Sequence, residues 1–166
     1  MPYPLFRGVE IIGTRHSEEP LPLSHAATIV TGGRGLGFTR AAPPHGIANA
    51  FAWRVQHGFE TLIEPLATVL GGAVGATRAV VDAAEIDASR LIGQSGLRVA
   101  PRLYIAVGVS GQPQHLQAIT RARHVVAINP DPTAPIFEVA DIAIIAEAER
   151  VIPDLITLID AHRAKS

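Results

Sequence analysis

The stretch LYIAVGVSGQPQHLQAI, residues 103–119, combines a short apolar run, a turn with two glycines and the start of a helix. The run LYIAV is apolar on both faces, which is typical of a parallel strand covered by helices on each side. Gly108 and Gly111 suit a turn whose backbone approaches a ligand, and Pro113 suits the first helical position. Amides of that first helical turn point toward an anion or a polarised carbonyl. The alternative is a tight turn in which Ser110 caps the helix.

The rest of the chain continues this alternation of strands and helices. Further strands are predicted at 26–31, 124–128 and 142–146, and helices at 59–70, 113–121, 136–140 and 151–163. Residues 73–84 are predicted to hold another strand and the beginning of a helix, whereas no element is predicted between 37 and 58. This order predicts an α/β fold, a Rossmann-like doubly wound parallel sheet in a single domain.

Composition limits the classes of partner. The chain has 166 residues, with 14 basic and 15 acidic side chains and a formal net charge of −1. Because neither sign of charge is concentrated, we expect no nucleic-acid partner and no anionic membrane surface. The longest weakly polar stretch, residues 66–76, is too short and too rich in glycine for membrane insertion. We therefore expect a soluble, cytoplasmic protein, and the absence of cysteine suits a reducing compartment.

The two ends of the sequence differ in organisation. Residues 1–25 contain Pro2, Pro4, Pro20 and Pro22 and little periodicity, which predicts an extended N-terminal arm. The domain is expected to occupy residues 26–166. Seven histidines lie along the chain without the spacing of metal ligands, so no metal site is predicted.

Other turns carry polar groups where strands end. GGRGLG (32–37) holds Arg34, but its glycine spacing is not that of a dinucleotide fingerprint. GVSGQ (108–112) lacks the closing glycine of a hydrolase elbow. NPDP (129–132) and GQSG (93–96) each have a plain alternative as a capped turn without a ligand. Two glycine-rich strand exits with one basic residue suit a diphosphate better than nucleophilic chemistry.

Arg78 is the remaining candidate for a binding residue. It stands in the otherwise apolar run GATRAVVDA (75–83), and a guanidinium on a buried element needs partners. A salt bridge to Asp82, four residues later, is its structural alternative. Because ligands of open parallel sheets bind beyond the carboxyl ends of the strands, Arg78 and the polar turns are expected to meet at one edge.

Taken together, these segments resemble the FAD-binding C-terminal domain of the electron transfer flavoprotein alpha subunit. The resemblance covers roughly residues 26–155 and is carried by VTGGRGL (30–36), LGGAVGATRAVVDA (70–83), IGQSGLRVAPRLYIAVGVSGQPQHL (92–116) and VVAINPDPTAPIFEVADIAII (125–145). It implies a Rossmann-like fold of the DHS-like NAD/FAD-binding type, with FAD bound in an extended form. It also implies a heterodimer, completed by a second subunit that binds AMP.

The resemblance implies a set of cofactor-binding residues by position. Arg78 would lie against the isoalloxazine ring. The Ser95 hydroxyl would face the flavin N5, and Gln94 is the residue directly before Ser95. His115 would be directed toward the pyrimidine carbonyl, the alternative being a solvated histidine at a helix end. The complete set is Arg34, Arg78, Gln94, Ser95, Gly108, Ser110, Gly111, Gln114, His115, Asn129, Asp131 and Glu147.

The remaining members of this set are assigned to the other parts of the cofactor. Ser110 and Gln114 fall near the diphosphate and the flavin, and Asn129 and Glu147 fall at positions that serve the adenosine half. Arg34 matches the family's arginine after the double glycine.

Several positions depart from the family's pattern. Leu97 and Pro130 stand where the family has lysines, and Ala88 and Leu91 replace an asparagine and a glutamine. Residues 37–58 form an insertion that the family usually lacks, and the family's N-terminal domain has no counterpart before the double glycine. The departures remove contacts to the flavin half more than to the adenosine half, so ADP or AMP is the alternative ligand.

The resemblance implies an FAD-binding module that carries single electrons and performs no substrate chemistry. The alternative is a nucleotide-binding (ADP or AMP) regulatory or partner-docking module without redox activity. Expected partners are a beta-like flavoprotein subunit, another redox protein, or a second copy of the chain in a homo-oligomer.

Overall fold

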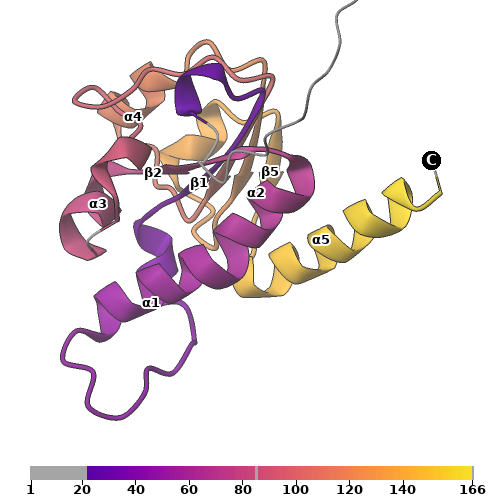
Figure 1. Ribbon diagram of the computed structural model, residues 1–166. Coiled ribbons are helices and arrows are strands. Elements are labelled where there is room, and N and C mark those ends of the chain that lie inside the picture. The colour runs from indigo at the N-terminus through magenta and orange to yellow at the C-terminus, as the bar shows by residue number, and fades with distance from the viewer. Residues whose placement is uncertain (1–21, 85, 166) are drawn as a thin grey trace, which may run out of the picture.

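A parallel sheet of five strands forms the centre of the molecule (Figure 1). A computed structural model describes residues 22–84 and 86–165 of the chain. The strands are β1 (Thr28–Gly32), β2 (Ala73–Ala76), β3 (Leu103–Val107), β4 (His124–Ile128) and β5 (Ile142–Ile144). Their order is β2-β1-β3-β4-β5, and every neighbouring pair is parallel. The predicted α/β fold with a doubly wound parallel sheet is therefore confirmed.

Helices cover both faces of this sheet. The α-helices are α1 (Ala50–Gly58), α2 (Glu64–Leu70), α3 (Arg78–Ala84), α4 (Pro113–Ala118) and α5 (Ala148–Arg163). A π-helical turn, η3 (Phe59–Ile63), joins α1 to α2, and short 3₁₀ turns are η1 (Leu23–His25), η2 (Arg34–Phe38), η4 (Ala88–Arg90) and η5 (Pro135–Glu138). Figure 1 shows α1, η3 and α2 as one continuous rod across the sheet, with α5 extending beside it.

Two apolar clusters, one on each face of the sheet, form the core. Val30 and Ile105 point to the face that α1, α2 and α5 cover, where they pack with residues such as Leu66. Ile29 and Tyr104 point to the opposite face, which α4 and η5 cover. The alternation of neighbouring residues between two buried faces explains why the strands are continuously apolar.

The helix that covers the first face begins earlier than predicted. It starts at Ala50 rather than at residue 59, so the expectation of no element between 37 and 58 is wrong for its last nine residues. The Asn49 side chain accepts a hydrogen bond from the Ala52 amide at 3.0 Å, which caps the helix. Val55, four residues before Phe59, is fully buried and continues the apolar stripe. At the other end, Gly71 stops α2 in the left-handed conformation.

The other element boundaries differ from the predictions by a few residues. Strand β1 begins at Thr28 instead of 26, α4 ends at Ala118 instead of 121, and α5 begins at Ala148 instead of 151. The predicted helix at 136–140 is the 3₁₀ turn η5. Of the predicted extended N-terminal arm (1–25), residues 1–21 lie outside the described part of the chain. Its last three residues form the 3₁₀ turn η1, with Leu23 buried, so they are not extended.

The strand order creates a switch point between β1 and β3. The chain leaves β1 toward the helices of one face and leaves β3 toward α4 on the other face. A crevice forms at the carboxyl ends of two such strands because their connections diverge. Within residues 22–84 and 86–165, no helix is both long and apolar enough to cross a membrane.

Candidate functional site

Two adjoining hollows lie at the carboxyl ends of the strands. The larger, here called the Arg78 hollow, measures about 530 Å³. Eight predicted residues line it: Arg34, Arg78, Gln94, Ser95, Ser110, Gly111, Gln114 and His115. The smaller, here called the Asn129 hollow, measures about 230 Å³ and is lined by the other four: Gly108, Asn129, Asp131 and Glu147. The fold thus brings the predicted residues together at one edge of the sheet.

The same two turns form part of the wall of both hollows. Arg34 and Val109 line the Arg78 hollow, and the adjacent residues Gly35 and Gly108 line the Asn129 hollow. The boundary between the hollows is therefore a pair of backbone turns at the β1–β3 switch point. An elongated ligand that crosses these turns would reach both hollows.

The glycines in these turns allow the two backbones to pack against each other. The Gly35 amide donates to the Gly108 carbonyl at 2.8 Å, and the Gly33 amide donates to the Val107 carbonyl at 2.9 Å. A Cβ atom at Gly33 would lie 2.5 Å from the Gly108 carbonyl oxygen. Gly108 also has a φ of +62°, which glycine adopts without strain. These glycines therefore pack the two turns together, and the approach of a ligand to Gly108 stays a prediction.

Arg78 forms the predicted salt bridge to Asp82 and also lies near Ser95. Its Nε donates to Asp82 Oδ2 at 2.9 Å, and its Nη1 lies 3.4 Å from Ser95 Oγ. The Arg78 side chain is 61% exposed, so the expectation of a guanidinium on a buried element is wrong for its charged end. An exposed cation at the wall of the Arg78 hollow is available to a ligand because Asp82 uses only one side of the guanidinium.

His115 is buried, and both of its ring nitrogens face protein atoms. Nε2 lies 2.7 Å from the Tyr104 hydroxyl oxygen, and Nδ1 lies 3.1 Å from the Ile92 carbonyl oxygen. The expected direction of a ring nitrogen toward a cofactor carbonyl is not seen, nor is the solvated alternative, since His115 is 5% exposed. Burial lowers the pKa of His115 below its ordinary value of 6.5, and the Ile92 carbonyl opposes this shift.

Ser110 does not cap helix α4. The N-cap residue is Gln112, which makes no side-chain capping bond, so that alternative is wrong. The Ser110 side chain is exposed at the hollow, and its carbonyl accepts the Ile136 amide at 2.9 Å. Gly111 is buried against the backbone of Ile136, which fixes η5 beside the turn.

The turn after β4 is held by its own polar side chains. Asn129 donates through Nδ2 to the Val109 carbonyl and accepts the Asp131 amide, both at 2.9 Å. Asp131 accepts bonds from the Thr133 hydroxyl at 2.7 Å and the Thr133 amide at 2.9 Å, which lower the pKa of the carboxyl below 3.8. The capped turn is therefore present, and it ties the exits of β3 and β4 together at the Asn129 hollow.

Arg34 and Arg40 flank the Asn129 hollow from the segment after β1. The Arg34 guanidinium lies 5.8 Å from the centre of the Phe38 ring, and Phe38 lines this hollow. Arg40, which the sequence did not point to, pairs with Glu147 at 3.2 Å and donates its amide to Glu149. The partners of Arg40 lie more than 100 residues away, so no local spacing signals the pair.

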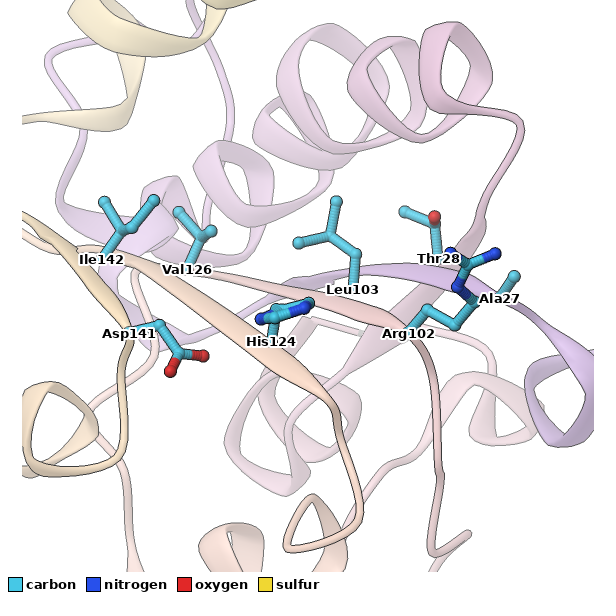
Figure 2. Close-up of a pocket in the computed structure, with 8 residues that line it drawn as sticks. All are labelled: Ala27, Thr28, Arg102, Leu103, His124, Val126, Asp141 and Ile142. Carbon is cyan, nitrogen blue, oxygen red and sulfur yellow. The ribbon is translucent and has the colours of Figure 1, made fainter.

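A third hollow of about 480 Å³ lies at the opposite end of the sheet (Figure 2). Strand side chains such as Leu103, Val126 and Ile142 form its apolar wall, with Arg102, His124 and Asp141 at its rim. The Asp141 carboxylate accepts the Val125 amide at 2.7 Å, so it stabilises the start of β4. None of the predicted site residues line this amino-end hollow.

The chain matches a known protein family over more than half of its length. The protein-family model described as "Electron transfer flavoprotein FAD-binding domain" matches residues 22–120 of the chain. The chain belongs to the electron transfer flavoprotein alpha family. This confirms the resemblance, whose motifs form the turns around the Arg78 and Asn129 hollows.

Individual relatives span bacteria and fungi. The chain is 45% identical over 139 residues to "Probable electron transfer flavoprotein subunit alpha, mitochondrial" of Saccharomyces cerevisiae, with 84% of this chain and 35% of the relative covered. It is 42% identical over 138 residues to the protein of the same description in Cryptococcus neoformans, with 83% and 35% covered. "Electron transfer flavoprotein subunit alpha" of Thermoanaerobacterium thermosaccharolyticum is 42% identical over 142 residues, with 86% and 38% covered. The chain thus spans little more than a third of each relative.

Proposed function

We propose that the chain binds FAD in an extended form and acts as a single-electron carrier. The observation that supports this proposal is the pair of adjoining hollows, which share the glycine turns of the β1–β3 switch point. A dinucleotide is elongated and carries a diphosphate near its middle, where backbone amides and a cation suit it. The larger hollow would take the ring system, and the smaller hollow would take the adenosine half.

The donor groups that line the hollows fit this cofactor. Arg78, Gln94 and Ser95 would hold the ring system, because the first is a cation and the others offer hydrogen bonds. Arg34 and Ser110 would face the diphosphate. The turn with Asn129 and Asp131, together with Glu147 at the start of α5, would serve the ribose and adenine. FAD supplies the redox chemistry when it is bound, and the chain binds it, orients it and sets the charge around it.

Arg78 has the charge that favours an electron-rich ring. A cation about 4 Å from a ring that gains an electron contributes up to ~4 kcal/mol at an effective dielectric constant of about 20. Solvent reduces this value here, because the Arg78 side chain is 61% exposed and pairs with Asp82. We therefore assign Arg78 a moderate effect on the flavin's reduction potential.

A beta-type flavoprotein subunit is the partner we propose. The chain covers only 35% to 38% of relatives that are named as alpha subunits. Exposed apolar side chains on β5 and α5, such as Ile142 and Leu158, are consistent with further protein contacts. A homo-oligomer is the second arrangement, and the mass of the protein in solution, alone and with a candidate subunit, separates the two.

The cytoplasm is the compartment we propose, on the basis of a cysteine-free composition. Relatives from Saccharomyces and Cryptococcus are named as mitochondrial, and the Thermoanaerobacterium relative is not. Cell fractionation followed by immunodetection tests this assignment.

The visible spectrum of the purified protein tests FAD binding. After incubation with FAD and removal of free flavin, we expect a yellow protein with flavin absorption, and stepwise reduction should pass through a one-electron stage. A protein that stays colourless would contradict the proposal. Calorimetry with FAD and with ADP distinguishes the alternative, since equal affinities would mean that the ring adds nothing and that the chain is an ADP or AMP module.

A further inference from the structure

A chain of buried polar groups lies directly behind the Arg78 hollow. Tyr104 on β3 is fully buried, and its hydroxyl oxygen lies 2.7 Å from His115 Nε2 on α4. His115 Nδ1 lies 3.1 Å from the carbonyl oxygen of Ile92. Three segments that are separate in the sequence, at 92, 104 and 115, are therefore joined through one imidazole ring.

The hydrogen-bond partners determine where the protons are. A carbonyl oxygen only accepts, so the bond to Ile92 requires a proton on His115 Nδ1. In a neutral imidazole Nε2 then accepts, so the Tyr104 hydroxyl is the donor at that end. Burial raises the pKa of the Tyr104 phenol above its ordinary value of 10.0, which keeps this donor protonated. His115 therefore has no ring nitrogen to offer a ligand while these bonds persist.

Ile92 is the residue on which the Gln94–Ser95 turn depends. Its amide donates to the Ala76 carbonyl at 3.0 Å at the end of β2, and its carbonyl accepts the His115 bond. The next residue, Gly93, has its amide bonded to the Leu97 carbonyl across the turn. Ile92 and His115 both line the Arg78 hollow, so their bond fixes the distance between the Gln94–Ser95 turn and the start of α4.

We infer that Tyr104 is a positioning residue. The Ile92 carbonyl selects the tautomer of His115, and the Tyr104 hydroxyl holds the ring in place so that it braces the Gln94–Ser95 turn against helix α4. The hydroxyl of Tyr104 acts on the hollow through His115 without touching the ligand. The effect on FAD rests on the proposed function, whereas the brace itself is a property of the protein without cofactor.

The first test needs no flavin. In protein with ¹⁵N-labelled histidine, we expect one of the seven imidazoles to show a protonated Nδ1 and an unprotonated Nε2 as a single tautomer. A His115→Gln variant assigns that signal by removing it. A His115 that is protonated at Nε2, or an equal mixture of tautomers, would overturn the inference.

The second test removes the Tyr104 hydroxyl and keeps the ring. In Tyr104→Phe, we expect the His115 Nε2 signal to shift, because its hydrogen-bond donor is lost, and amide exchange at Gly93 and Gly96 to become at least about tenfold faster. The dissociation constant for FAD should rise at least about fivefold, because the turn that carries Gln94 and Ser95 is less ordered. Unchanged exchange and an unchanged His115 Nε2 signal in this variant would also overturn the inference.

Thr31→Val provides the matched control. The Thr31 hydroxyl is buried beside the phenol of Tyr104 but forms no hydrogen bond of ordinary geometry among the described residues. Its loss should leave the His115 tautomer and the exchange at Gly93 unchanged and FAD binding within about twofold. A Thr31→Val variant that reproduces the effects of Tyr104→Phe would show a general packing effect and contradict the assigned role.

The two proposals fail in different ways. If the unaltered protein binds no FAD, the proposed function fails, and the tautomer and exchange measurements still test the brace. If the unaltered protein binds FAD and Tyr104→Phe binds it equally well with an unchanged His115 signal, the brace alone fails.

Discussion

The two ends of the sheet have hollows of similar size but different construction. The Arg78 hollow at the carboxyl ends measures about 530 Å³, and the amino-end hollow measures about 480 Å³. Turns with glycine and exposed polar side chains form the first, whereas strand side chains form most of the second (Figure 2). At the amino end, the Asp141 carboxylate already binds a backbone amide of its own sheet. Volume alone therefore does not distinguish the ends, whereas the glycine turns at the carboxyl ends do.

The difference follows from the geometry of parallel strands. Every strand of this sheet points the same way, so all strand-to-helix turns gather at one edge. Connections diverge there at the β1–β3 switch point, while at the amino end the chain enters the strands. We expect substitutions at the carboxyl end to change ligand binding and matched substitutions at the amino end to leave it unchanged.

The largest expected effect follows the substitution Gly33→Ala. Gly33 has an extended backbone with φ of −119°, so alanine meets no conformational strain, but its Cβ would lie 2.5 Å from the Gly108 carbonyl oxygen. Separating the two turns should lower the free energy of unfolding by about 1 to 3 kcal/mol, as overpacking does. Denaturant titration measures this loss, and FAD binding should weaken with it.

Thr28→Ser is the control at the other end of the same strand. It removes one methyl group from a half-buried side chain at the amino-end hollow, which costs at most about 0.8 kcal/mol. FAD affinity should not change in this variant. If Gly33→Ala is as stable as Thr28→Ser, the backbone contact between the two turns is not close in solution.

The second prediction concerns the two arginines at opposite ends. Arg78→Ala should weaken FAD binding on the order of tenfold, or about 1.4 kcal/mol. The loss of a cation near the ring should also lower the reduction potential, by on the order of 60 mV for a tenfold preference in a one-electron couple. Calorimetry and a reductive titration against a reference dye measure the two effects.

Arg102→Ala is the matched control, because Arg102 is an exposed arginine at the rim of the amino-end hollow. We expect its affinity and potential to equal those of the unaltered protein. Arg78→Lys should keep most of the potential, since it keeps the charge. An unchanged affinity and potential in Arg78→Ala would reduce Arg78 to a partner of Asp82.

The sequence predicted the sheet and the site edge better than their details. Continuous apolar runs such as YIAV predicted buried strands, and the position of polar turns after them predicted which edge would hold Arg78, Ser95 and Asn129. That FAD binds there stays a prediction. Helix α1 was missed because its start depends on the Asn49 cap. The cap follows a segment with two prolines, and the apolar pattern of the helix covers too few residues there to predict it.

The bonds that determine side-chain direction were not predictable from local patterns. His115 turns inward because Tyr104 and Ile92 meet it from 11 and 23 residues away. Arg40 pairs with Glu147, which lies 107 residues later in the sequence. Such pairs depend on the packing of separate elements, so motif spacing gives the residue and the edge but not the partner.

The third and smallest predicted effect compares two histidines at opposite ends of the sheet. Because burial lowers the pKa of His115 below 6.5, the unfolded chain binds more protons than the folded protein once the pH falls below that value. The free energy of unfolding contributed by a neutral His115 is therefore fully present above pH 6.5 and is lost as the pH falls toward the folded pKa. One proton limits the slope to about 1.4 kcal/mol per pH unit.

Denaturant titrations between about pH 7.5 and about pH 5 measure this slope, which corresponds to a difference of about one bound proton at most. His115→Gln should flatten the pH dependence, since glutamine does not titrate. His124→Gln should keep it, because His124 is exposed at the amino-end hollow. Equal slopes in the two variants would mean that protonation of His115 does not cause the loss of stability at low pH. A neutral His115 would then not stabilise the carboxyl end of the sheet.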